Sequence, residues 1–212
     1  MRWSSISAER VTRENQVQVD RFRILVLVVA MLIVAAFAGW RASRPRPLGP
    51  PPGAFAIVSG RGGASVQAAA IGDTLLVTSG ARFAVGDLVT VRFADGLEAT
   101  GVVGAIQYVE DQIPVAYVGL SGGGRARATI ALGALAGSEG LPTTVICVLP
   151  SGGLAGTGVD AQSLLSGAPS VELQCGDGAA VVVENLLAAI LLSKTGDPAQ
   201  LRVVPAESLV IP

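Results

Sequence analysis

The sequence predicts a mostly β protein with one N-terminal transmembrane helix, and two patterns support this expectation. Residues 24–40, ILVLVVAMLIVAAFAGW, hold no charge and are flanked by Arg21, Arg23 and Arg41. From Ala54 onward, short runs of Ala, Val and Leu alternate with glycine-rich turns, as in strands joined by tight turns. Half of the residues are apolar and only 15% are charged. One spanning segment does not account for so large a share of apolar residues.

The uncharged segment is nearly long enough to cross a bilayer. Its length at a helical rise is roughly 26 Å, against a hydrocarbon core of about 30 Å. Phe22 and the snorkelling arginines can supply the rest, so we expect the helix at residues 22–40. A cleaved signal peptide would have a shorter apolar core and a small-x-small cleavage site. A segment with Arg and several prolines follows here instead.

The flanking charges predict which side of the membrane each part occupies. Five arginines lie on the N-terminal side and three on the C-terminal side, so the positive-inside rule favours a cytoplasmic N-terminus. We therefore expect a cytoplasmic tail at 1–21, a linker at 41–53 and an extracytoplasmic, for example periplasmic, domain at 54–212. Residues 44–53, RPRPLGPPPG, are typical of an extended, semi-rigid spacer.

Charge and composition exclude several kinds of partner and chemistry. From residue 54 onward there are seven basic and thirteen acidic side chains, so we expect no nucleic-acid partner, because phosphate binding needs clustered Lys and Arg. The basic tail suits anionic lipids.

The sequence contains no histidine, the commonest general base and metal ligand. We expect no cofactor, no metal site and no small-molecule substrate.

Two cysteines are present, 28 residues apart, each within a strand-like segment: Cys147 in TTVICVL and Cys175 in SVELQC. Outside the cytoplasm we expect a disulfide between them. Two buried thiols are the alternative.

The domain divides at a Gly-rich segment, SGGGRA, at 121–126. Asp95-Gly96, between apolar runs, predicts a hairpin at 93–97. The run Val181–Leu192 is too short for a second span and predicts a core strand or a short buried helix. Strand-like runs begin at Ala54, Ser65, Thr74, Asp87, Leu97 and Pro114, and after the break at Ala128, Thr143, Ser170, Ala179 and Leu201. This spacing predicts a barrel or a sandwich.

Three stretches in order resemble the membrane-tethered, trypsin-like serine proteases of the HtrA/DegS kind. TLLVTSGARF (74–83) resembles the strand and turn that present the catalytic histidine. The hairpin at 89–120 is similar to the family's Asp-Gly hairpin and the strand whose aspartate completes the triad. GVDAQSLLSGAPSVELQCGDGAAVVV (158–183) resembles the nucleophile region. The resemblance implies two six-stranded β-barrels with the site between them.

The departures from this family concern the catalytic residues. The histidine position is occupied by the sequence Thr78 to Arg82, and the triad aspartate falls near Ile113 or Pro114, with Asp111 close by. Ser166, in Leu-Ser-Gly-Ala-Pro, matches the nucleophile. A serine without a neighbouring base is a weak nucleophile.

We therefore expect a non-enzymatic protein: a degenerate protease fold, or pseudoprotease, that is a binding, scaffold or accessory subunit of an envelope or membrane complex. Its expected partners are the lipid bilayer and proteins in the membrane or envelope. One alternative is an atypical serine hydrolase using Ser166, for which Lys194, the only lysine, would be the candidate base. Another is a periplasmic adaptor of a transport system, although no long heptad segment is present.

Overall fold

The computed structural model describes residues 29–31, 49–138, 140–166, 175–194 and 201–212. Residues 49–212 form one compact unit and residues 1–48 belong to another. Within the described ranges, no helix is long and apolar enough to span a bilayer. The predicted span at 22–40 lies outside those ranges, except for residues 29–31, which are helical.

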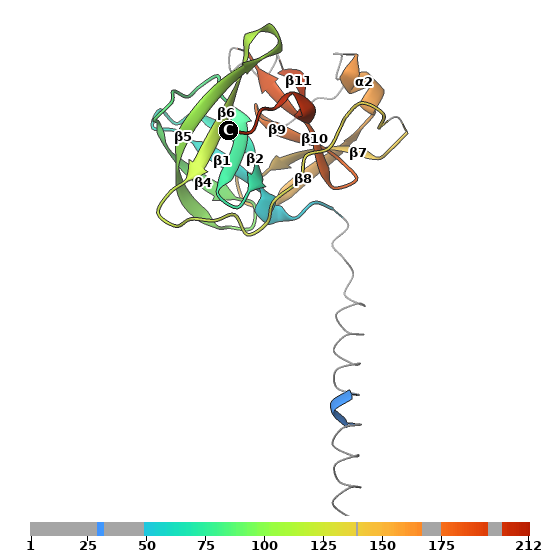
Figure 1. The fold of residues 1–212 in the computed structure, drawn as a ribbon, viewed down its shortest axis with the longest axis horizontal. Coiled ribbons are helices and arrows are strands. Elements are labelled where there is room, and N and C mark those ends of the chain that lie inside the picture. Colours follow the sequence, from blue (N-terminus) through green and yellow to red (C-terminus); the bar gives the residue numbers. More distant parts are fainter. Residues whose placement is uncertain (1–28, 32–48, 139, 167–174, 195–200) are drawn as a thin grey trace, which may run out of the picture. The chain divides into compact units, whose positions relative to one another are not determined.

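The first half of the compact unit is a closed six-stranded barrel (Figure 1). Its strands are β1 (Phe55–Ser59), β2 (Ser65–Gly72), β3 (Leu75–Ser79), β4 (Leu88–Phe93), β5 (Glu98–Val109) and β6 (Ile113–Leu120). All pairs are antiparallel, in the order β1-β2-β3-β6-β5-β4, and β1 closes the barrel by pairing with β4. The predicted hairpin at 93–97 is confirmed, since it joins β4 to β5 and Gly96 has a φ of 86°. Two short 3-10 turns belong to this half, η1 (Pro52–Ala54) and η2 (Glu110–Gln112).

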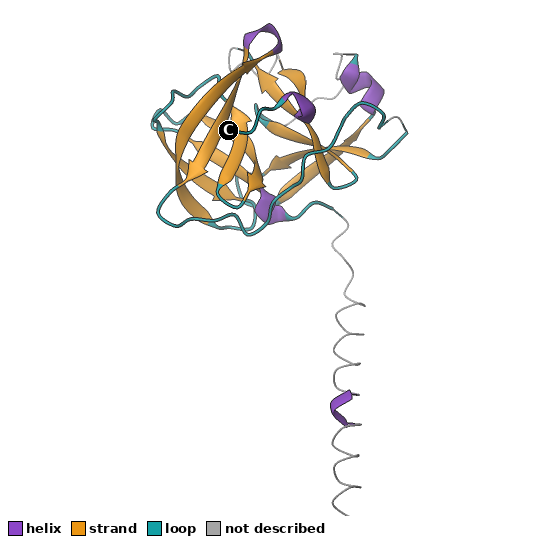
Figure 2. Ribbon diagram, in the orientation of Figure 1, coloured by secondary structure: helices purple, strands orange, loops and turns teal. Residues whose placement is uncertain are grey.

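The second half is a five-stranded antiparallel sheet. Its elements are β7 (Thr143–Val148), β8 (Leu154–Val159), α2 (Ala161–Leu165), β9 (Ala179–Val183), β10 (Leu186–Ser193), β11 (Leu201–Pro205) and the 3-10 turn η4 (Ala206–Ser208). The strand order is β11-β10-β9-β7-β8. Figure 2 shows that strands dominate both halves and that the helices are short. The mostly β fold is therefore confirmed.

Several expectations for the second half are corrected, decided or left open. In place of a second closed barrel, the described residues form an open sheet. The strand predicted at 170–175 lies outside the described residues except for Cys175. The strand predicted from Ala128 is wrong, because that segment contributes only an isolated bridge between Leu132 and Leu187. The run Val181–Leu192 is a hairpin, not a helix, and its turn residues Glu184 and Asn185 have φ values of 50° and 67°.

The barrel and the sheet share a continuous core, because several strands are buried on both faces. In β1, Ala56 and Val58 face the barrel interior, while Phe55 and Ile57 pack against residues of the second sheet such as Leu192. This is the period-two alternation of a strand, with apolar residues at every position. A third cluster joins the other face of the second sheet to α2.

The predicted disulfide is confirmed: Cys147 of β7 and Cys175 are bonded, with their Cα atoms 5.3 Å apart. Both cysteines are buried in the cluster beneath α2. The bridge closes a loop of 28 residues, which restricts the unfolded chain.

We expect replacement of Cys147 and Cys175 together by alanine to lower the unfolding free energy by about 3 kcal/mol. Urea unfolding of the variant measures the loss. Reductant should reduce the stability of the wild type toward that of the variant and leave the variant unchanged. A wild-type curve insensitive to complete reduction would contradict this expectation.

Candidate functional site

The segment predicted to hold the histidine position lies at the end of β3. The side chains of Thr78 and Ser79 are fully buried there, and Thr78 Oγ1 donates to the carbonyl of Gln67, 2.5 Å away. The chain then turns away through Gly80, whose amide donates to the carbonyl of Pro114 at 2.8 Å. The tertiary structure thus brings the predicted histidine position and one predicted aspartate position together.

Asp177, which was not among the residues predicted from the sequence, is the central residue of this region. It precedes β9 and is 5% exposed. Its Oδ2 accepts a hydrogen bond from Ser79 Oγ at 2.6 Å, and its Oδ1 accepts one from the amide of Ser193 at 2.9 Å. Its backbone carbonyl accepts from the amide of Gln67 at 2.7 Å. One residue therefore connects β2 and β3 of the barrel with β10 of the sheet.

Gln67 makes a second connection between the same two halves. Its Nε2 donates to the carbonyl of Val148 at 3.2 Å, and its Oε1 accepts from the amide of Val148 at 2.8 Å. This pair of bonds resembles a backbone pairing between β2 and β7. Together, Gln67 and Asp177 form a polar junction between barrel and sheet, which we call the junction.

The junction requires glycine after Asp177. Gly178 has a φ of 89°, and a Cβ there would overlap the backbone of Gln67. Its amide donates to the carbonyl of Leu191 at 2.8 Å. Only a residue without a side chain lets the two backbones approach this closely.

Comparison with solved structures finds similar folds. A human astrovirus serine protease aligns over 76% of this chain and 96% of its own, with a TM-score of 0.53 and 16% identity. The compact unit has the fold of a trypsin-like serine protease. The Rv3671c protease in an inactive form aligns over 72% of this chain and 83% of its own, with a TM-score of 0.48 and 12% identity. No protein-family model matches the sequence, and no curated protein gives a significant match.

Within this trypsin-like fold, Ser166 lies at the end of α2. It is the C-cap residue, it is exposed, and its hydroxyl donates to the carbonyl of Ser163 at 2.9 Å. The neighbouring residues 167–174 lie outside the described ranges. The role of Ser166 as a vestigial nucleophile therefore stays a prediction. Lys194 follows β10 directly and is exposed.

Two signals in the sequence could have pointed to Asp177. It lies between two glycines, a pattern typical of a turn, and directly before the apolar strand β9. It also follows Cys175 by two residues, and Cys175 is bonded to Cys147 of β7. Gln67 carried no comparable signal, because a single polar residue in an alternating strand normally faces water.

Burial raises the pKa of Asp177, and the hydrogen bonds from Ser79, Ser193 and Gly178 and the charge of Arg82 offset this only in part. The folded protein therefore holds the proton more tightly than the unfolded chain. This contribution to stability is complete below the ordinary Asp pKa of about 3.9 and is lost as pH rises through the raised folded-state pKa. We expect this fall in a urea-unfolding series against pH, and expect it to be missing in Asp177→Asn. Identical pH profiles would contradict it.

A hollow of about 560 Å³ opens beside the junction. It is lined by β2, the β7–β8 hairpin and the disulfide, and no lining residue is charged. The lining residues are Ile57, Ser65, Val66, Gln67, Cys147, Val148, Leu149, Pro150, Ala155, Thr157, Cys175 and Gly176. Its walls are fixed by the disulfide and by the two bonds of Gln67 to Val148.

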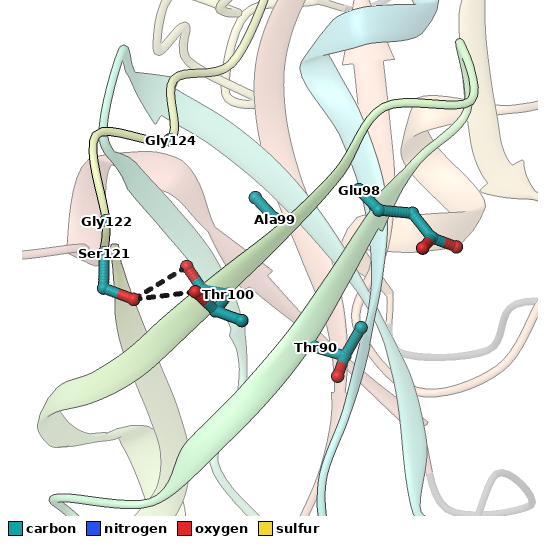
Figure 3. A pocket seen from close by; sticks show the side chains of 7 residues that line it. All are labelled: Thr90, Glu98, Ala99, Thr100, Ser121, Gly122 and Gly124. Atoms are coloured by element: carbon teal, nitrogen blue, oxygen red, sulfur yellow. Dashed lines mark hydrogen bonds between the residues drawn. The ribbon is translucent and has the colours of Figure 1, made fainter.

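A second, shallower hollow of about 390 Å³ lies on the outside of the barrel. Figure 3 shows its lining, with Ser121 hydrogen-bonded to Thr100 and with Glu98 and Thr90 on the strands beside it. None of the predicted site residues contributes to it. Within the described residues, no group of His, Cys, Asp or Glu side chains could hold a metal ion.

Proposed function

We propose that this chain is a membrane-anchored, non-catalytic trypsin-like domain that acts as a binding or accessory subunit of an envelope or membrane complex. The anchor in this proposal is the segment 22–40, which contains the uncharged run 24–40, with the tail in the cytoplasm and residues 54–212 outside. The alternative of a serine hydrolase would need a base for Ser166.

The observation that carries the proposal is the bonding of Ser79 to Asp177. The resemblance places a catalytic imidazole at the end of β3, where this chain instead has a buried serine hydroxyl 2.6 Å from a buried carboxylate. No histidine exists in the sequence to replace it. Side chains at this position connect the two halves of the domain, and a rigid connection suits a scaffold.

The uncharged hollow beside the junction is the proposed docking place. Along a strand, the backbone amide and carbonyl groups of successive residues point alternately to one side of the strand and to the other. Because the amide and carbonyl of Gln67 point toward Asp177 and Thr78, those of Ser65 point to the same side. An extended segment of a partner protein could pair with this backbone by β-addition. Preformed, mainly apolar hollows of this size are typical of binding sites.

A fluorophosphonate probe tests the absence of catalysis in the full chain purified in mild detergent. We expect no labelling above that of the heat-unfolded protein. Labelling of the wild type that disappears in Ser166→Ala would establish a hydrolase instead. A soluble serine protease in the same reaction verifies the probe.

A second experiment tests the docking place. Thr157→Trp should fill the hollow, while Thr90→Trp places the same side chain on another exposed strand position. Partners that co-migrate with the wild type from native membranes should be lost at least tenfold in Thr157→Trp and retained in Thr90→Trp. Equal recovery with both variants would remove the hollow from the proposal.

A further inference from the structure

Apolar side chains are exposed in the loop between β3 and β4 and at the first residue of β4. Val85 is 62% exposed and Leu88 is 56% exposed. Phe83 is partly buried against the barrel core. Arg61, on the neighbouring loop between β1 and β2, is also exposed. We call Arg61, Phe83, Val85 and Leu88 the loop patch.

The loop that carries these side chains is held by backbone hydrogen bonds. The amide of Gly86 donates to the carbonyl of Val103 at 2.8 Å, and the amide of Val103 donates to the carbonyl of Asp87 at 3.0 Å. The Asp87 carboxylate accepts from the amide of Ala84 at 2.8 Å. Val85 therefore sits at the tip of a turn that is fastened to β5 on one side and closed by Asp87.

The two loops enclose one hollow of about 270 Å³, to which both contribute arginine. Arg61, Phe83 and Leu88 line it together with Arg82 and Asp87. The charge of Arg82 also acts on the buried Asp177, so Arg61 supplies the positive charge that we assign to the patch. The carboxylate of Asp87 is bound within its own turn.

We propose that the loop patch contacts the surface of the anionic bilayer in which the chain is anchored. This inference rests on the proposed anchor at 22–40. Exposed apolar side chains beside arginine are the combination that binds the boundary between headgroups and acyl chains. Residues 54–212 carry a net charge of −6, so an anionic surface repels most of the domain and favours an approach through a basic, apolar end.

Tethering makes such a small patch sufficient. Residues 44–48, the part of the spacer that precedes the compact unit beginning at Gly49, reach roughly 16 Å when fully extended at about 3.1 Å per residue. A domain on a tether of that length is at high effective concentration near the bilayer. A weak contact that would fail for a free domain then still orients the tethered one.

A single environment-sensitive dye tests the contact in the full chain. Both native cysteines are in the disulfide, so Val85→Cys introduces the only free thiol. Tyr108→Cys is the matched control, since Tyr108 is 69% exposed and lies five residues beyond Val103 on β5, about 17 Å along the strand. The labelled chains are placed in nanodiscs of phosphatidylcholine alone or with phosphatidylglycerol.

We expect the dye at position 85 to shift to shorter wavelength in the anionic nanodiscs and the dye at position 108 to remain unchanged. Arg61→Glu should abolish the shift, and inorganic phosphate should not reproduce it. A spectrum at position 85 that ignores lipid composition, or that shifts only when another envelope protein is added, would overturn the proposal.

Hydrogen exchange of the unsubstituted chain gives an independent answer. Amides of residues 83–88 should exchange more slowly in anionic than in neutral nanodiscs, and equal rates would also overturn the proposal. Failure of the anchor itself looks different, because the chain would then not co-migrate with nanodiscs of either composition.

Discussion

Gly178→Ala should lower the unfolding free energy of the domain by at least about 4 kcal/mol, a larger loss than we expect from Asp177→Ala. Two costs combine at this position. The φ of 89° is unfavourable for alanine by about 1–2 kcal/mol. The new methyl group would also overlap the backbone of Gln67, and a fixed backbone cannot yield as a flexible side chain can. Separation of β2 from the start of β9 would break the junction.

Urea unfolding of full-length Gly178→Ala in detergent, followed by circular dichroism, measures this effect. Gly176→Ala is the matched control, two residues earlier in the same segment, because a Cβ there meets nothing within 4 Å. The control should unfold within about 0.5 kcal/mol of the wild type. Similar midpoints for the two variants would show that Gln67 and Gly178 do not approach as described.

Asp177→Ala should be the second most damaging change, at about 3–4 kcal/mol. It would leave Ser79 Oγ and the amide of Ser193 without their acceptor in a buried place. Hydrogen bonds to charged groups contribute about 1.5–3 kcal/mol each, and a buried donor without a partner is costly. Removing the carboxylate also removes the free-energy cost of burying it, which offsets part of that loss. Among the described buried side chains, Ser193 Oγ has no hydrogen-bond partner, so Asp177→Ala would leave a second polar group of the same residue unsatisfied.

Two comparisons separate the carboxylate from a general surface effect. Asp73→Ala changes an exposed aspartate and should be neutral within about 0.5 kcal/mol. Asp177→Asn keeps the shape and one acceptor oxygen, so it should lose less than Asp177→Ala. If Asp177→Ala were as stable as Asp73→Ala, the junction would not hold the two halves together.

Regular local patterns made much of the β structure predictable. Runs such as FAIVS and LLVTS are short, apolar and bounded by turn residues, and strands followed wherever such runs lay between clear turns. The segment from Ala128 misled the prediction because its apolar residues pack into the core from a loop. Val181–Leu192 could not be assigned from periodicity, since a strand buried on both faces lacks alternation.

The candidate site was less predictable than the fold. The family resemblance pointed to the end of β3, and the strand-like segments around Cys147 and Cys175 pointed to a disulfide between them. The sequence did not point to Gln67 or Asp177, whose partners are far away along the chain. Ser79 and Asp177 are 98 residues apart in sequence, and Gln67 and Val148 are 81 apart.

By itself, the sequence determined the strand-rich composition, the absence of histidine and the uncharged segment at 24–40, because each depends only on residue types and their local order. Only the tertiary structure decided that Asp177 is buried at the junction and that Gly178 must lack a side chain. Burial, close backbone approach and a raised pKa arise when segments distant in sequence pack together, and no local pattern contains that information.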